Sequence, residues 1–345
     1  MDPFSGQTQS KLISRRDFLA ASASAIGTIA LSAGSTSRAA ELDPAQEKAL
    51  IAISLDLEMA RNFPNWNDTH WDYEKGNLNQ ETKQYAVEAA RRVKARGGVI
   101  HFFLVGRALE QEKIDWLQEI IRTGHSVGNH TYDHVYLLAN RPEEIQYRFQ
   151  RAPWLIEGKA PLEVIRENIR LTNAAFKSRL GIKPAGFRAP GGFAEGLAQR
   201  PDVQKMLIEM GFPWVSTKYP AHPNSEPGTP PTRDILDGIV KAQTAAQPFV
   251  YPSGLIEIPM SPISDIGAFR NGRWKLEHFL QAIRQSVEWT IEKNACFDFL
   301  AHPAVLYSMD PEFRAIDLIC DLVAKAGSRA TLVTLDRIAE RSSSL

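Results

Sequence analysis

From residue 48 onward, short apolar runs alternate with longer segments in which apolar residues recur at helical spacing. This alternation is typical of βα units around a parallel sheet or barrel, because helices cover the apolar faces of such a sheet. Strands are predicted at 51–58, 99–105, 125–130, 185–188, 212–216, 255–261, 297–302 and 331–335. Helices are predicted at 80–96, 110–123, 161–180, 201–210, 276–294 and 311–326. The pattern indicates an α/β chain with one distorted, TIM-like barrel domain.

Prolines interrupt this pattern in one place. The segment 213–252 holds eight of the 21 prolines of the chain, which is too many for regular elements. Beyond the strand at 212–216, we therefore expect a long loop on one rim of the barrel, with an interdomain linker as the alternative.

Charge and cysteine content exclude several classes of protein. The chain has 40 Lys+Arg and 40 Asp+Glu residues, so it lacks the basic surface that binding to nucleic acid requires. Two cysteines are too few for a disulfide scaffold or a Cys-rich zinc module. Because Cys320 falls on an apolar helical stripe, we predict that it and Cys296 are buried, unpaired thiols rather than a disulfide.

The N-terminus has the pattern of an export signal. Arg15 and Arg16 precede a weakly apolar segment that leads to the small-residue site Ser37-Arg38-Ala39. This run is too short and too polar to span a bilayer, and the paired arginines resemble a twin-arginine signal. We expect residues 1–39 to be cleaved and 40–345 to be periplasmic or secreted, without stable membrane insertion. The alternative is a disordered tail with a chance arginine pair.

Two carboxylates share one face of the first predicted strand. Odd positions of 51–58 are Ile or Leu, whereas the even positions are Ala52, Ser54, Asp56 and Glu58. In a barrel the small and polar set would face the lumen, which places Asp56 and Glu58 at the rim where barrel enzymes carry their chemistry. Taken alone, a solvated strand end explains the pair equally well.

A histidine pair follows the third predicted strand. If a helix begins near Thr131, the i,i+4 spacing puts His130 and His134 on one side, within reach of one ion. The alternative is a surface helix start with two titratable groups. Together with Asp56 and Glu58, these residues offer the oxygen and nitrogen ligands that suit a divalent transition metal.

Two further side chains lie where a predicted strand gives way to a turn. Arg188 stands in Gly-Phe-Arg-Ala-Pro-Gly-Gly (186–192), and His302 in Phe-Leu-Ala-His-Pro (299–303). A lone histidine at a strand end is more often structural than catalytic.

In chain order, five of these segments resemble the polysaccharide deacetylases, the NodB-homology family also called carbohydrate esterase family 4. The family's T-F-D-D-G-like opening resembles 54–58, and its A-T-F-F-V-x-G strand resembles 101–106. Its G-H-x-x-G-N-H-T-x-x-H motif is similar to 124–134, its R-x-P-x-G to 188–192, and its closing histidine to His302. The resemblance covers most of residues 50–338.

The resemblance implies a distorted (β/α)7 barrel that deacetylates N-acetylated amino sugars of a polysaccharide or oligosaccharide by attack of metal-bound water. It implies that His130 and His134 are metal ligands, that Asp56 is the general base, that Arg188 pairs with Asp56, and that His302 is the general acid. One divalent ion is expected. Ligand type and availability favour zinc over cobalt, nickel or manganese.

Three departures from the family pattern limit this transfer. Many members have adjacent aspartates, but Leu57 follows Asp56, so the metal carboxylate must be Glu58. Val215 stands where an aspartate often orients the catalytic histidine, which leaves Asp265 as a guess for the partner of His302. The segments 135–184 and 217–252 are longer than a minimal deacetylase needs, and we expect them to form long loops that wall the groove differently.

Other functions remain as alternatives. The same fold supports carbon–nitrogen hydrolysis of small amides, ureides or imides, or a catalytically inactive carbohydrate-binding homologue. The full set of ligand, acid and base residues argues against the inactive homologue, and the export signal favours glycans over small amides. Trp66, His70, Trp71 and Tyr73 suit stacking on sugars or packing equally well. The sequence makes no prediction of oligomeric state.

Overall fold

The computed structural model describes residues 48–59 and 75–343. The export signal predicted at 1–39 and the aromatic residues between 66 and 73 lie outside this part of the chain. Within it, every helix is too short or too polar to cross a membrane. Cys296 and Cys320 are buried and unpaired, which confirms that prediction.

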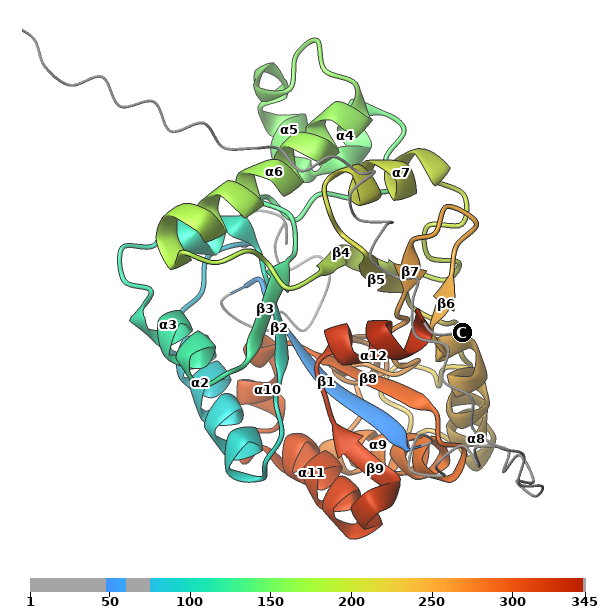
Figure 1. Ribbon diagram of the computed structural model, residues 1–345. Helices are drawn as coiled ribbons and strands as arrows, with labels where there is room; N and C mark the ends of the chain where they lie inside the picture. Colours follow the sequence, from blue (N-terminus) through green and yellow to red (C-terminus); the bar gives the residue numbers. More distant parts are fainter. Residues whose placement is uncertain (1–47, 60–74, 344–345) are drawn as a thin grey trace, which may run out of the picture. The chain divides into compact units, whose positions relative to one another are not determined.

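The strands form one curled sheet in the order β6-β7-β5-β4-β3-β2-β1-β8, with β9 paired to β1 (Figure 1). All pairings are parallel except that of β6 with β7. The strands are β1 (Ala49–Leu57), β2 (His101–Leu104), β3 (Ser126–Asn129), β4 (Phe187–Phe193), β5 (Trp214–Lys218), β6 (Phe249–Val250), β7 (Ile256–Glu257), β8 (Cys296–Ala301) and β9 (Ala330–Leu332). Each predicted strand is present. The curled, mainly parallel sheet confirms the distorted barrel of a single domain.

Helices line the outside of the sheet, and each predicted helix is present. They are α2 (Gln80–Ala95), α3 (Asp115–Arg122), α4 (Pro142–Ile145), α5 (Tyr147–Arg151), α6 (Pro161–Leu180), α7 (Pro201–Glu209), α8 (Arg233–Ala242), α9 (Leu276–Glu292), α10 (Pro303–Met309), α11 (Arg314–Ala326) and α12 (Leu335–Ser342). Shorter helical turns are η2 (Gly106–Glu110), η3 (Pro153–Leu155), η4 (Gln243–Ala246) and η6 (Gly327–Arg329), and η5 (Ile266–Asn271) is a π-helix.

The two segments predicted as long loops contain more regular structure than expected. The segment 217–252 holds α8, η4 and β6, so the loop prediction is wrong there. Its prolines lie at or before Pro231 and from Pro248 onward, which leaves a proline-free stretch where Thr232 caps α8 by accepting a hydrogen bond from the Ile235 amide. The segment 135–184 holds α4, α5 and η3 before the predicted helix α6.

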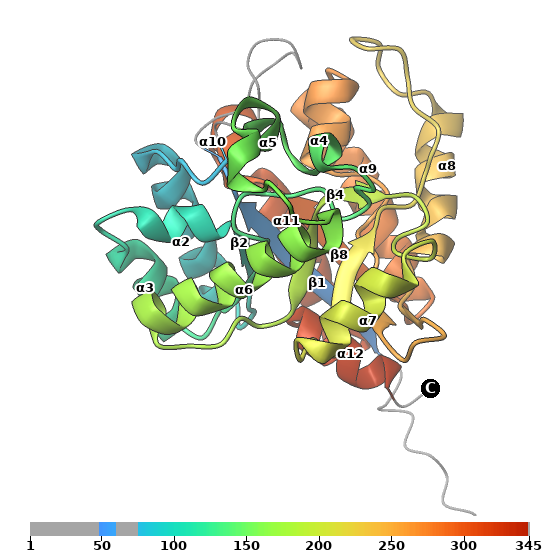
Figure 2. The same cartoon turned by 90° about the horizontal axis from the view of Figure 1, so that it is seen from above.

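The alternation along β1 separates the outer core from the barrel lumen. Ile51, Ile53, Leu55 and Leu57 belong to the main hydrophobic cluster with residues of α2, α9 and α11. Ala52 on the other face belongs to a smaller cluster in the lumen, which includes residues of α12. Figure 2 shows α12 at one end of the barrel, with α4, α5 and α10 at the other. The carboxyl ends of the strands therefore open toward the end that α12 does not cover.

Candidate active site

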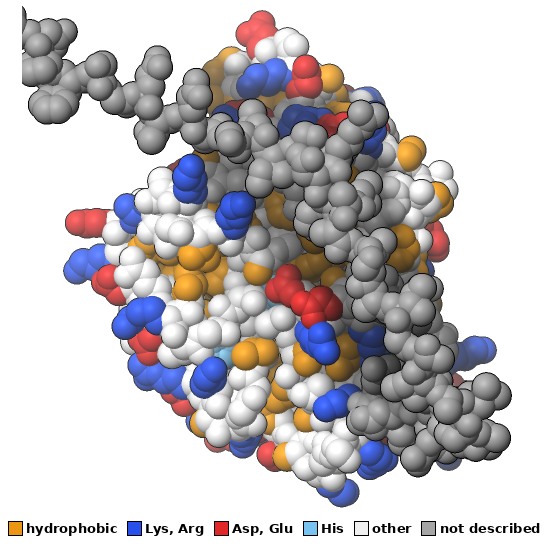
Figure 3. Space-filling view, in the orientation of Figure 1, with side chains coloured by type: hydrophobic (Ala, Val, Ile, Leu, Met, Phe, Trp, Pro, Cys, Tyr) orange, Lys and Arg blue, Asp and Glu red, His pale blue; other side chains and the backbone are white. Residues whose placement is uncertain are grey.

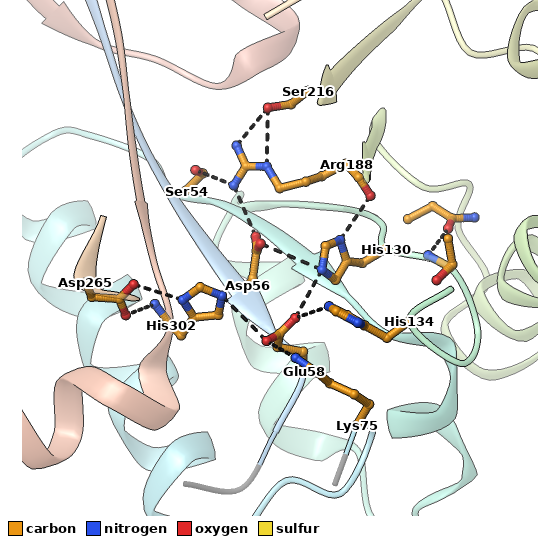
Figure 4. Close-up of polar contacts among 12 residues, drawn as sticks. Ser54, Asp56, Glu58, Lys75, His130, His134, Arg188, Ser216, Asp265 and His302 are labelled. Atoms are coloured by element: carbon orange, nitrogen blue, oxygen red, sulfur yellow. Dashed lines mark hydrogen bonds and ion pairs between the residues drawn. The ribbon is translucent and has the colours of Figure 1, made fainter. Parts of the chain in front are cut away.

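Asp56 and Glu58 reach the open end of the barrel from β1. Asp56 is the second-to-last residue of β1, and Glu58 comes directly after the strand. Both side chains are buried. In Figure 4 both carboxylates point toward the same group of histidines. The period-two alternation predicted from the sequence is what puts both on one face.

His130 and His134 come together through a turn and not through a helix. Residues 131–137 contain no helix, and Thr131 and His134 have left-handed φ angles of 58° and 61°. The Asn129 side chain accepts a hydrogen bond from the Thr131 amide at 2.8 Å, and the Thr131 hydroxyl accepts one from the Val135 amide at 3.0 Å. The predicted helix start is wrong, but the two imidazole rings still lie 5.1 Å apart between centroids.

Three potential metal ligands converge here. Glu58 Oε2 lies 3.2 Å from His130 Nε2 and 2.7 Å from His134 Nε2. One ligand atom of each residue lies within 4.8 Å of those of the other two. His130 Nδ1 lies 3.0 Å from the carbonyl oxygen of Arg188 and donates its proton there, which leaves a lone pair on Nε2 facing Glu58. One carboxylate and two imidazoles in this arrangement fit a divalent transition metal.

Lys75 is a neighbour of this cluster that sequence reasoning missed. Its ammonium forms a buried ion pair with Glu58 Oε1, whereas His130 and His134 contact the other carboxylate oxygen, Oε2. The Gly76 amide donates to the Glu58 carbonyl at 2.7 Å, which brings the two segments together. Gly76 has a φ of 85°, and a Cβ there would lie 2.4 Å from Arg107 Cβ. No motif around Lys75 signals this contact.

The charges around Glu58 keep it anionic. Burial by itself raises the pKa of Glu58, but Lys75, His134, His302 and His130 together hold that pKa well below its usual value. Burial, followed by the charge of Lys75, lowers the pKa of His134 to about 4. His134 is therefore neutral near pH 7, which is the form of imidazole that binds a metal ion.

Arg188 lies across the lumen and holds Asp56 in place. Its Nη1 donates to Asp56 Oδ1 at 3.1 Å and to Ser54 Oγ at 2.7 Å, so the predicted contact between Arg188 and Asp56 is present. The same guanidinium donates to Ser216 Oγ on β5 and pairs with Asp298 on β8. Arg188 thus links three strands and is completely buried, with Asp56 at its outer end.

Asp298 and Ser216 were not predicted. Asp298 interrupts the apolar run Phe297 to Ala301, and that buried polar position is the signal that could have found it. The partners of Arg188 depend on which strands the curled sheet brings near it, which local pattern does not reveal.

His302 follows β8 and has an orienting carboxylate. Its Nδ1 lies 2.9 Å from Asp265 Oδ1, and its backbone amide donates to Asp265 Oδ2 at 2.6 Å. The guess that Asp265 contacts His302 is confirmed. Asp265 caps η5, whereas Val215 is a buried core residue.

The pKa of His302 favours its protonated form. Burial lowers this pKa, but the charges of Asp265, Glu58 and Asp56 and the hydrogen bond that the ring donates to Asp265 raise it above its ordinary value. His302 Nε2 lies 3.6 Å from Glu58 Oε1, so the ring faces the same cluster as the potential metal ligands (Figure 4).

These groups line one cavity of about 250 Å³. Asp56, Glu58, Lys75, His134 and His302 contribute its polar side, and its other lining residues include Tyr219, Met260, Ile266 and Leu300. A few polar groups in a mostly apolar hollow are characteristic of small-molecule sites. The cavity therefore combines a carboxylate oriented by an arginine, an imidazole oriented by a carboxylate, and potential metal ligands.

Not every residue of the recognised motifs belongs to this cluster. His125, in the same segment as His130, instead accepts a hydrogen bond from the Ile100 amide at Nδ1, at 2.9 Å. Burial lowers its pKa to about 4, so it is a neutral structural histidine.

Comparison with known proteins agrees with this geometry. Residues 72–212 match the family model described as polysaccharide deacetylase. A structure described as a polysaccharide deacetylase from Mycobacterium smegmatis has a TM-score of 0.56 at 15% identity, over 86% of this chain and 91% of that one. Another with that description, from Pseudomonas aeruginosa, has a TM-score of 0.56 at 13% identity, over 84% of this chain and 89% of that one.

The structure of the allantoinase Puue has a TM-score of 0.52 at 14% identity, over 84% of this chain and 89% of that one. Comparison with curated protein sequences finds no match. At these identities the structural likenesses show a shared fold, and the family match adds the sequence relationship. Residues 72–212 thus match the polysaccharide deacetylase family, and the solved structures show that the chain shares its fold with proteins of that description.

Proposed function

We propose that this protein is a metal-dependent hydrolase that removes acetyl groups from N-acetylated amino sugars of a polysaccharide or oligosaccharide. The observation that carries the proposal is the convergence of Asp56, Glu58, His130, His134 and His302 at one end of the barrel. They lie at the ends of three strands, β1, β3 and β8, and the acid and the base each have an orienting partner. Such paired support is what general acid–base catalysis requires.

The ion would be held by Glu58, His130 and His134. When bound, a divalent ion polarises the acyl carbonyl and lowers the pKa of water. The separate use of the two Glu58 oxygens supports this assignment, since Oε2 faces His130 and His134 while Lys75 balances charge at Oε1. The donor set favours zinc over cobalt, nickel or manganese.

The remaining chemistry belongs to the residues of the chain. The Asp56 carboxylate, oriented by Arg188, accepts a proton as the water oxygen bonds to the acyl carbon. His302, protonated and oriented by Asp265, gives a proton to the amide nitrogen as the carbon–nitrogen bond breaks. The products are acetate and a free amino sugar. Each proton transfer typically contributes about 10²- to 10⁴-fold in rate.

Hydrolysis of a small amide is the second candidate. The fold is shared with an allantoinase, and a cavity of about 250 Å³ suits a small cyclic amide as well as an acetamido group. The acid, base and metal roles would be unchanged, so the substrate alone separates this candidate from the first.

The direct test compares both substrate classes under metal-replete conditions. Acetate release is measured with chitin oligomers, peptidoglycan and acetylated exopolysaccharide, beside hydrolysis of allantoin and simple imides. We expect acetate release from at least one glycan, and release that is slower by about 10²- to 10⁴-fold in the Asp56→Asn variant. Turnover of allantoin or imides alone would favour the second candidate, and no turnover of any amide would favour an inactive carbohydrate-binding protein.

We further propose that the protein reaches the periplasm by a twin-arginine route, from the signal predicted at residues 1–39. Replacing Arg15 and Arg16 by Lys should trap a folded, metal-loaded and active precursor in the cytoplasm, because these residues precede the barrel. Activity assays on fractionated cells check this. Normal export of the double variant would refute the route and leave the catalytic assignment intact.

A further inference from the structure

A second hollow lies beside the catalytic cavity. This neighbouring hollow of about 530 Å³ shares His134 and Gly191 with the catalytic cavity. Its far wall is built by the segment 136–150, from Tyr136 through α4 and α5. In Figure 2, α4 and α5 lie at the end of the barrel opposite α12, which is the end toward which the carboxyl ends of the strands open.

A third hollow extends the same path. Its volume is about 820 Å³, and it shares Glu143 and Gln150 with the second hollow. It is bounded further along the segment by Pro153 and Trp154. Shared lining residues therefore place the three hollows next to one another along the segment from His134 to Trp154.

Exposed aromatic residues mark this run. Trp154 is 69% exposed and Tyr136 is 43% exposed, and both line the hollows just described. Of the described large hydrophobic residues with high exposure, only Ile208 and Val250 lie outside the segment 136–155. The Tyr136 ring is held edge-on against Phe193, with centroids 5.5 Å apart, so it is a fixed platform. Rigid aromatic faces suit the apolar faces of sugar rings.

The wall that carries these residues is anchored to the barrel. Ile145, Phe149 and Ile156 are buried in one cluster with Val164 and Ile165 of α6. The Gln146 side chain donates to the Asp133 carbonyl, and Arg148 pairs with the Asp133 carboxylate. A wall fixed in this way can hold a ligand at a set distance from His134.

The charges along the wall balance one another. Arg141 Nη2 lies 2.7 Å from Glu144 Oε1, and the Gln150 side chain donates to the Glu143 carbonyl at 2.7 Å. On the face shown in Figure 3, the Lys/Arg and Asp/Glu side chains of the described residues are likewise interspersed. A polar wall without an excess of one charge suits neutral, hydroxyl-rich rings better than a highly charged polymer.

We propose that the segment 135–160 extends the catalytic cavity into a glycan-binding groove, in which Tyr136 and Trp154 stack on sugar units beyond the one being deacetylated. This inference rests on the proposed deacetylase function and specifies its substrate as an oligomer or polymer. The enzyme therefore prefers longer glycans to the monosaccharide, because only longer chains reach Trp154.

The test measures binding directly, so that it does not depend on turnover. In the Asp56→Asn background, calorimetry compares N-acetylglucosamine, chitin oligomers of increasing length, and fragments of peptidoglycan and acetylated exopolysaccharide. The gain in affinity is the ratio of the affinity for the longest oligomer to that for N-acetylglucosamine. It is expected to fall roughly ten-fold in Trp154→Ala and in Tyr136→Ala, which corresponds to about 1.4 kcal/mol. Trp154→Phe should restore most of that gain. Ile208→Ala is the matched control, since Ile208 is exposed on α7 and lines none of the three hollows.

The outcomes separate this inference from the proposed function. The groove proposal is overturned if affinity does not grow with chain length for any glycan. It is also overturned if the two alanine variants bind like Ile208→Ala, even when acetate is released. Oligomer binding that weakens in both alanine variants would support the groove, even if the wild-type protein releases no acetate. In that case the deacetylase assignment fails and the groove stands.

Discussion

Two buried glutamates, Glu58 and Glu257, illustrate how differently one residue type is used in this barrel. Glu257 ends β7 and accepts hydrogen bonds from the Thr217 amide and hydroxyl, both at 2.6 Å, and from the Lys218 amide and the Tyr251 hydroxyl, both at 2.8 Å. Its donors are neutral, and burial raises its pKa above the usual value. Glu58 instead faces an ammonium and three imidazoles, and its pKa is well below the usual value.

The difference follows from what each carboxylate connects. β5 and β7 pair over two residues on each strand, and the Glu257 side chain adds hydrogen bonds to Thr217 and Lys218 at the end of β5. Glu58 connects titratable groups that arrive from separate elements at the edge of a cavity. Burial of a carboxylate is thus a weak sign of function, whereas titratable partners and an adjoining cavity are a strong one.

Removing a metal ligand should have the largest effect. His134→Ala is expected to abolish stoichiometric metal and to reduce turnover to background, because two ligands hold a divalent ion poorly. Elemental analysis after dialysis, with activity assays, measures both. Glu257→Gln is the matched control and should keep its metal. If His134→Ala retains stoichiometric metal, Glu58 and its partners are no metal site and the contrast with Glu257 loses its basis.

Neutralising the base should have the next largest effect. Asp56→Asn is expected to lower kcat by about 10²- to 10⁴-fold while the metal is retained, because Asp56 accepts a proton but does not hold the ion. Steady-state kinetics with elemental analysis checks this, and Glu58→Gln, which should lose the metal, is the paired variant. The opposite result, with metal lost in Asp56→Asn and kept in Glu58→Gln, would exchange the two roles.

Weakening the support of the acid should shift the pH dependence. Activity should fall as pH rises through the pKa of His302, since the acid must be protonated, and Asp265 contributes to raising that pKa. Asp265→Asn is therefore expected to move the alkaline limb of kcat/KM to lower pH and to cost roughly ten-fold in rate at neutral pH. A pH–rate profile measures this. If the alkaline limb does not move, Asp265 only positions the backbone of His302 and does not set its pKa. The His302→Ala profile is the control that shows whether this limb reports His302.

Changing Glu257 should leave turnover nearly unaffected. Glu257→Gln should instead lower the stability by about 1–3 kcal/mol, because the amide nitrogen, unlike either oxygen of a carboxyl group, cannot accept a hydrogen bond. Glu257 has a raised pKa in the fold, so its stabilising contribution is complete below its unfolded-state pKa and declines as pH rises through its folded-state pKa. The deficit of the variant should therefore be greatest at acidic pH. Denaturant unfolding at several pH values measures this stability deficit. A large loss of kcat with unchanged stability would contradict the structural role of Glu257 and its contrast with Glu58.

Local sequence pattern was enough to predict the barrel and, together with the family motifs, several of the residues that meet at its open end. The alternation of Ile or Leu with small and polar residues in 51–58 determines which face of β1 is buried against the helices. Strands whose carboxyl ends meet at one rim then bring Asp56, His130, Arg188 and His302 into the same region. These inferences succeed because side-chain direction in a strand and the parallel arrangement of βα units are local and repetitive properties.

The tertiary structure alone decided how these residues are partnered. Asp265 and His302 are 37 positions apart, and Arg188 and Asp298 are 110 positions apart, so their contacts depend on the curl of the sheet and the path of the loops. The turn at Thr131, the ion pair of Lys75 with Glu58 and the wall formed by α4 and α5 have the same origin. A one-dimensional pattern predicts which side of an element is buried, but it does not specify the three-dimensional route by which distant segments meet.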